Sequence, residues 1–218
     1  MTDYDNFAKT FSESRKDMKW KEIEYFISLL QVGHSHKILD IGCGNGRLLE
    51  HMKNSRIIYR KYLWIDKSLL LLNEARDLHE EAIFVHKDME DISEIEENFT
   101  ALFFIASFHH LESLESRVKV LKSCYHILDA GWCIYLTNWN LLSFDNLQKY
   151  KDALIPDSQD EFRSRDFSIN FGKYPRFYHG FSLDELEFIA KESGFEVIEN
   201  RVFDGERNIV TVLRKIER

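Results

Sequence analysis

The sequence predicts an α/β fold with a mixed seven-stranded sheet, mostly parallel, with an antiparallel hairpin late in the chain. Short apolar runs alternate with amphipathic stretches, as they do when strands alternate with helices around a parallel sheet. The turn signal Asp204-Gly205 separates the last two runs, which predicts a hairpin and hence antiparallel strands. A length of 218 residues suits one domain, 1–218, that buries a sizeable core.

The apolar runs and their periodicity place the individual elements. Helices are expected at 47–53, 69–80 and 115–128, and the last of these has apolar residues at helical spacing. Ser182 followed by Glu185 is a capping box that opens a last helix, and Gly194 is its stop signal. The seven strands are expected at 37–41, 62–65, 82–85, 101–105, 133–136, 195–200 and 208–214.

Two segments fall outside this alternation. Residues 1–30 are expected to form one or two helices that cover the sheet before the first strand. Residues 141–180 are aromatic, charged and poor in periodicity, so we expect an irregular insertion before the last helix that acts as an acceptor lid.

Composition excludes several classes of protein. The formal charge of -8 argues against a surface that binds nucleic acid all over, although it allows a local basic groove. Three cysteines without a CxxC pair predict a reduced, cytoplasmic protein without disulfides or a cysteine-based metal site. We also expect no signal peptide and no association with a membrane, since no apolar run approaches the ~20 residues of a membrane span.

A glycine-rich loop directly follows the first predicted strand. Gly42, Gly44 and Gly46 give the spacing GxGxG, whereas the dinucleotide fingerprint is GxGxxG, and Arg47 occupies its third position. Glycines there let the backbone approach a ligand closely. An acid, Asp40, precedes the loop, which suits a cationic ligand better than a pyrophosphate.

Two further acids follow the next two strands. Asp66 ends the second strand, where a carboxylate can accept both hydroxyls of a ribose. Asp88 follows the third strand and could accept from an adenine amino group, with the Met89 backbone N–H donating to the ring. A dinucleotide-binding domain and, for Asp88, a solvated loop acid are the alternatives.

Together these residues resemble class I S-adenosylmethionine (SAM)-dependent methyltransferases, which have a Rossmann-like fold. The resemblance implies SAM as cofactor and S-adenosylhomocysteine as product. Arg15, in the N-terminal cover, could bind the cofactor's carboxylate or the acceptor. The residues expected to bind the cofactor are therefore Arg15, Asp40, Gly42, Cys43, Gly44, Asn45, Gly46, Asp66, Lys67, Asp88, Met89 and Ala106.

Further segments resemble one family within this class, the tRNA wobble-uridine methyltransferases, which esterify a carboxymethyl group on the anticodon's first base. The segments are FSESR at 11–15, IASFHHL at 105–111, TNW at 137–139 and RFYH at 176–179. The sequence departs from the family at Ser14, at the turn 129–132 and at Ile209. The resemblance implies tRNA as partner and, as for eukaryotic relatives, a small zinc-binding activator protein. A small-molecule O- or N-methyltransferase and a non-catalytic SAM-binding partner protein remain alternatives.

The proposed chemistry assigns roles near the acceptor. A carboxylate nucleophile is already ionised at neutral pH and needs no general base. Arg176 is expected to bind it bidentately, with Tyr178 and His179 orienting the acceptor. An amine or hydroxyl acceptor would need a base, which His109, His110 or His179 could supply.

Overall fold

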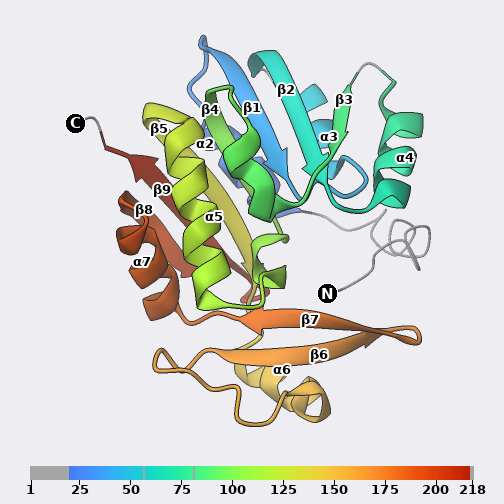
Figure 1. The fold of residues 1–218 in the computed structure, drawn as a ribbon, viewed down its shortest axis with the longest axis vertical. Coiled ribbons are helices and arrows are strands. Elements are labelled where there is room, and N and C mark those ends of the chain that lie inside the picture. The colour runs from blue at the N-terminus through green and yellow to red at the C-terminus, as the bar shows by residue number, and fades with distance from the viewer. Residues whose placement is uncertain (1–19, 56, 81, 217–218) are drawn as a thin grey trace.

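The computed structural model describes residues 20–55, 57–80 and 82–216, and it confirms the mixed seven-stranded sheet (Figure 1). The strand order is β3-β2-β1-β4-β5-β9-β8. The first five strands are parallel, whereas β9 runs antiparallel to both β5 and β8. The strands of the sheet are β1 (Ser35–Ile41), β2 (Ile58–Asp66), β3 (Ile83–His86), β4 (Phe99–Ile105), β5 (Leu128–Trp139), β8 (Phe195–Val202) and β9 (Asn208–Lys215).

Helices cover both faces of the sheet (Figure 1). One face carries α5 (Leu114–Ile127), α7 (Leu183–Glu192) and the 3-10 helix η2 (Met89–Glu94). The other face carries α2 (Lys21–Leu29), α3 (Arg47–Lys53) and α4 (Leu69–Leu78). No helix in the described ranges has the length and apolar character to cross a membrane.

Alternating residues of each central strand enter two separate cores. On β1, Leu39 and Ile41 pack toward α5 and α7, while Ile38 packs toward α2 and α3. On β4, Phe104 packs in the first of these cores and Phe103 in the second. Because both faces are covered, these strands are apolar throughout, which explains why they stand out as continuous apolar runs in the sequence.

The insertion at 141–180 is more regular than its sequence predicted. It contains α6 (Phe144–Lys149), the 3-10 helix η4 (Lys151–Ala153) and a two-stranded sheet of β6 (Arg165–Phe171) and β7 (Tyr174–Gly180). The hairpin β6–β7 lies at the end of the main sheet where the parallel strands finish (Figure 1). Leu141, Phe167 and Tyr178 form a small core of its own. On β6, Phe167, Ile169 and Phe171 alternate with polar residues, so the strand had a usable signal in the sequence.

The start of α7 confirms half of the predicted capping box. The Ser182 hydroxyl accepts a hydrogen bond from the Glu185 N–H at 3.1 Å, as predicted. The Glu185 carboxylate, however, does not return to the Ser182 N–H, which donates instead to the Ser164 hydroxyl at 2.9 Å. The Glu185 side chain is fully buried and serves a different network, described below.

The remainder of the predicted N-terminal cover, 1–19, falls outside the described residues.

Candidate active site

A cavity of about 530 Å³ lies at the carboxyl ends of β1, β2, β4 and β5, where open α/β sheets bind ligands. Its walls come from the glycine loop, from the segments after these strands and from β7 of the hairpin. Most of the predicted site residues therefore meet in one place. Those that line the cavity are Asp40, Gly42, Cys43, Gly44, Asn45, Asp66, Lys67, Asp88, Met89, Ala106, His109, Arg176 and Tyr178.

The glycine loop adopts a shape that requires glycine. Gly42, Gly44 and Gly46 have φ values of 71°, 56° and 83°, in the left-handed region. A Cβ on Gly42 would lie 2.5 Å from the Cβ of Ser107. The Gly42 N–H donates to the carbonyl of Ile65 at 2.8 Å, which ties the loop to the end of β2. The loop therefore presents bare backbone to the cavity. Gly46 itself is not among the lining residues, because it caps the start of α3.

Asp40 places a buried carboxylate in the cavity wall. Its side chain is 1% exposed, and neither carboxylate oxygen has a hydrogen-bond partner within the described residues. Burial and the nearby charge of Asp66 raise the pKa of Asp40 well above its usual range, and Arg47 only partly opposes them. A cationic ligand would supply the missing counter-charge. The ammonium and sulfonium groups of SAM are cations, so this residue fits the cofactor.

Asp66 is held in a fixed orientation for hydrogen bonding. Its two carboxylate oxygens accept from the N–H groups of Ser68 and Gly44, each at 2.8 Å. Burial raises the pKa of Asp66 more than these two bonds lower it. A carboxylate has about four acceptor positions, so capacity remains for two ribose hydroxyls.

Asp88 and Met89 form the adjacent wall. Asp88 accepts from the Glu90 N–H at 3.2 Å and so caps η2, while both Asp88 and Met89 line the cavity. Ala106 has a left-handed backbone with φ 53°, and its N–H donates to the Thr137 hydroxyl at 2.9 Å. A left-handed backbone is strained for a residue other than glycine, and it persists only where the surrounding structure holds it in place.

Arg176 and Tyr178 form the wall contributed by the hairpin. They are 2% and 4% exposed, and the Arg176 guanidinium carbon lies 4.9 Å from the centre of the Tyr178 ring. Trp139, at the end of β5, packs edge-on against Tyr178 at 5.5 Å between centroids. This end of the cavity therefore combines a positive charge with an aromatic wall.

The hydrogen bonds of the two histidines after β4 assign opposite neutral tautomers to them. The Trp139 N–H donates to Nδ1 of His109 at 3.3 Å, so a neutral His109 carries its proton on Nε2. Nδ1 of His110 lies 2.8 Å from the Phe177 carbonyl and donates to it. Burial, with the neighbouring charges of His109 and Arg176, holds the pKa of His110 well below its usual range. The lone pair of a neutral His109 is therefore occupied, whereas a neutral His110 keeps its lone pair on Nε2 and is a weak base because its pKa is low.

His179 lies outside the cavity, which corrects its predicted role in contacting the acceptor. Successive side chains of a strand point to opposite sides, so His179 faces away from Tyr178. Its Nδ1 lies 2.6 Å from a carboxylate oxygen of Asp166, and its Nε2 lies 2.7 Å from one of Glu185. The other predicted residue not placed here, Arg15, is outside the described residues.

Some cavity residues were not predicted as site residues. The Arg47 guanidinium stacks over Trp20 at 4.4 Å, and that of Arg207 lies 5.8 Å from the same ring. The position of Arg47, directly after the glycine loop, was a usable signal. Arg207 lies in the β8–β9 turn, and its position carried no comparable signal. Burial and Asp66 raise the pKa of the Cys43 thiol well above its usual range, so Cys43 contributes its backbone and not a thiolate.

Comparison with known proteins defines the class. Residues 38–131 match the methyltransferase domain family. The chain is 25% identical over 212 residues to a methyltransferase-like protein of Encephalitozoon cuniculi, which covers 97% of this chain and 93% of that protein. It is 24% identical over 213 residues to the tRNA (carboxymethyluridine(34)-5-O)-methyltransferase of Schizosaccharomyces pombe, covering 90% and 88%.

Two solved structures show the same fold. A SAM-dependent methyltransferase of Methanosarcina mazei superimposes with a TM-score of 0.71 at 19% identity, covering 89% of this chain and 98% of that one. A chain in the complex between the Haloferax volcanii Trm112 methyltransferase activator and a methyltransferase gives 0.72 at 15% identity, covering 100% and 99%. The matched domain identifies this protein as a methyltransferase, and its fold is that of SAM-dependent methyltransferases.

Proposed function

We propose that this methyltransferase esterifies a carboxylate, that of a 5-carboxymethyluridine-type base at the wobble position of tRNA. The observation that carries the proposal is the buried guanidinium of Arg176 in the cavity wall. A guanidinium binds a carboxylate through two parallel hydrogen bonds and so can orient one oxygen toward the methyl group.

The chemistry of the cavity favours an acceptor that needs no base. Methyl transfer from a sulfonium is an in-line displacement in which the carboxylate oxygen attacks the methyl carbon and the electron pair of the broken bond stays on sulfur. The leaving group is neutral, so the enzyme's main task is to hold the reacting atoms in line. A carboxylate is ionised at neutral pH. Nδ1 of His109 already accepts from the Trp139 N–H, and the lowered pKa of His110 makes it a weak base, so a carboxylate suits the cavity better than an amine or hydroxyl.

The relatives support the choice of RNA and the expectation of a partner. The name of the Schizosaccharomyces pombe relative describes methylation of carboxymethyluridine in tRNA, and the match extends over most of both chains. A structure with the same fold was solved with a methyltransferase activator. We therefore propose that the protein acts on tRNA and that a small activating protein of this kind assists it.

The test is methyl transfer from labelled SAM to carboxymethylated tRNA, run with and without an activator protein. We expect a base-labile methyl ester. Arg176→Lys keeps the charge but loses the bidentate geometry, so kcat/KM should fall about tenfold to a hundredfold. Arg165→Lys is the matched control, because Arg165 makes an exposed hydrogen bond to Gln159 away from the cavity.

Two results would contradict the proposal. A base-stable product would exclude an ester. Labelling of a metabolite extract with no labelling of tRNA, in either arm, would favour the small-molecule alternative.

A further inference from the structure

A row of four charged side chains joins four elements behind the cavity wall; three of them are buried, and the side chain of Asp166 is 25% exposed. Nε of Arg117, on α5, lies 3.2 Å from Oε1 of Glu185, on α7. Oε2 of Glu185 lies 2.7 Å from Nε2 of His179, on β7. Nδ1 of His179 lies 2.6 Å from Oδ1 of Asp166, its cross-strand partner on β6. We call Arg117, Glu185, His179 and Asp166 the buried charge chain.

The geometry requires a proton on both nitrogens of His179. A neutral imidazole has one N–H and one lone pair, and here the lone pair would face a carboxylate oxygen at hydrogen-bond distance. With both nitrogens as donors, positive and negative charges alternate along the buried charge chain and cancel. Burial lowers the pKa of His179, but the hydrogen bonds to Asp166 and Glu185 outweigh it and raise the pKa above its usual value.

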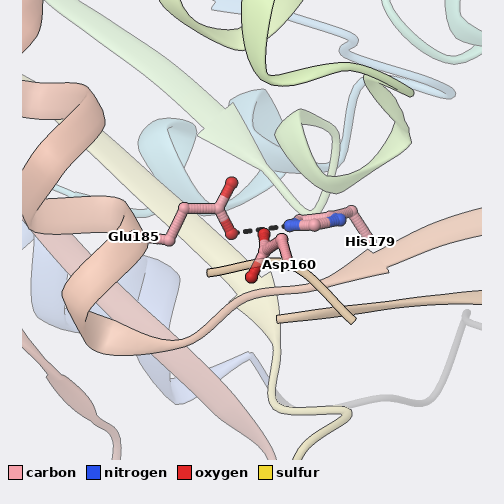
Figure 2. A group of neighbouring side chains, drawn as sticks. All are labelled: Asp160, His179 and Glu185. Carbon is pink, nitrogen blue, oxygen red and sulfur yellow. Dashed lines mark hydrogen bonds and ion pairs between the residues drawn. The ribbon is translucent and has the colours of Figure 1, made fainter. Parts of the chain in front are cut away.

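A metal ion is the competing occupant of this region. Asp160, His179 and Glu185 each place a ligand atom within 4.8 Å of the others (Figure 2). However, a metal on His179 would displace the Nε2 proton, and the second oxygen of Glu185 already faces Arg117. Asp160 also has a structural task, since its Oδ1 accepts from two backbone N–H groups, at 2.9 and 2.8 Å. Arg117, Glu185, His179 and Asp166 balance one another in charge without an ion.

The buried charge chain contacts both walls of the acceptor end of the cavity. His179 follows Tyr178 directly on β7, the strand that also carries Arg176. On the other side, Nη1 of Arg117 donates to the Leu111 carbonyl at 2.9 Å, and Leu111 lines the cavity just after the two histidines.

An aromatic contact joins the two walls a second time. Phe181 packs edge-on against His179 at 4.6 Å and stacks on Phe108 at 5.7 Å, between ring centroids. Phe108 begins the 3-10 helix η3 (Phe108–His110), which carries His109 and His110. A shift of β7 would therefore disturb both walls.

We propose that His179, as an imidazolium between Asp166 and Glu185, is a positioning residue for methyl transfer. It fixes β7 against α5 and α7. It thereby holds Arg176 and Tyr178 in place opposite His109 and His110 of η3. The claim that methyl transfer to the acceptor depends on His179 rests on the proposed function. The claim that His179 is doubly protonated does not.

The first test measures protonation directly in the full-length protein. With 15N-labelled histidine, we expect long-range 1H–15N spectra to show both His179 nitrogens protonated at pH values above about 6.5, the ordinary histidine pKa. His179→Gln assigns the signal. A single protonated nitrogen at neutral pH, or a stoichiometric metal ion by elemental analysis, would overturn the proposal. Neither result depends on the acceptor, so a failure here is distinguishable from a failure of the proposed function.

The second test separates positioning from general stability. Glutamine cannot donate from both ends of its side chain, so His179→Gln should lower kcat/KM for the acceptor at least tenfold while SAM binding by calorimetry changes less than about threefold. His126→Gln, on the exposed end of α5, is the control and should leave both unchanged. If His179→Gln keeps full kcat/KM, the positioning role is wrong. If this variant does not fold, the spectra of the unmodified protein still decide the protonation claim.

The pH dependence has a definite sign. Since the pKa of His179 is raised by folding, its stabilising contribution is complete below about pH 6.5 and is lost as the pH rises through the folded value. Burial raises the pKa of Glu185, yet the His179 bond and Arg117 lower it overall, so its contribution is lost only as the pH falls through that lowered value. Arg117, Asp166 and Asp160 are the other charged groups that face His179. Unmodified protein should therefore lose stability at alkaline pH more steeply than His179→Gln.

Discussion

At the scale of single residues, Asp40 has opposite effects on stability and on binding. Its carboxylate is buried without a hydrogen-bond partner among the described residues, and burial raises its pKa well above the usual range. A raised acid pKa means that the folded state loses stability as the pH rises above the unfolded value, about 3.9. A bound cation removes this cost. The buried charge of Asp40 thus destabilises the free protein and favours binding of a cationic ligand.

We predict that Asp40→Asn binds SAM about tenfold to a hundredfold more weakly, the cost of one charge-assisted interaction. The same variant should unfold at a higher urea concentration than the unmodified protein at neutral pH, since no charge is buried. Calorimetry and urea titration measure the two effects. Asp77→Asn, at an exposed position of α4, is the control and should change neither. Equal affinity of Asp40→Asn and the unmodified protein would contradict the assignment.

At the scale of elements, the glycine loop depends on close contact with the segment after β4. Gly42 combines a φ of 71° with a Cβ position 2.5 Å from Ser107. Ser107 cannot easily move away, because its hydroxyl donates to the Ile41 carbonyl at 2.6 Å. Substitution here therefore adds a clash to backbone strain.

Gly42→Ala should lose about 2 to 5 kcal/mol of stability, from left-handed strain and overpacking together, and should lose SAM binding. Gly33 is a matched control, with φ 91° and no atom within 4 Å of an added Cβ. Gly33→Ala should lose only about 1 to 2 kcal/mol and should bind SAM normally. Denaturant titration and calorimetry distinguish the two. Similar losses in both variants would show that the contact with Ser107 is unimportant.

The elements also show what local sequence can predict. The helix at 47–53 was predicted at both ends, because Gly46 and the apolar spacing are local signals. Asp66 was predicted from its sequence separation from the glycine loop, since the lengths of the intervening helix and strand set that separation. The β6–β7 hairpin was missed although apolar residues alternate with polar ones on β6, because β7 lacks this alternation. The buried charge chain was missed because Arg117 and His179 come together around Glu185 only in the folded protein, and pairings between distant segments leave no local pattern.

At the scale of the whole molecule, the cavity draws on segments from both halves of the sheet and from the insertion. A ligand that binds this cavity therefore binds only the folded state and stabilises every element that forms it. The stabilisation follows from mass action and amounts to about 2.7 kcal/mol at a hundredfold excess over Kd. SAM should also remove the destabilising effect of the buried Asp40 charge.

We therefore predict that SAM at about a hundredfold excess over Kd raises the melting temperature by about 5 to 11 °C, since 1 kcal/mol corresponds to about 2 to 4 °C in a domain of this size. S-adenosylhomocysteine should also raise it, whereas a nicotinamide dinucleotide should not, because GxGxG leaves Arg47 where the dinucleotide fingerprint has its third glycine. Differential scanning calorimetry measures the shift. A shift with the dinucleotide and none with SAM would remove the basis for the cofactor, and with it the methyl-transfer mechanism, because every role assigned to the cavity depends on that ligand.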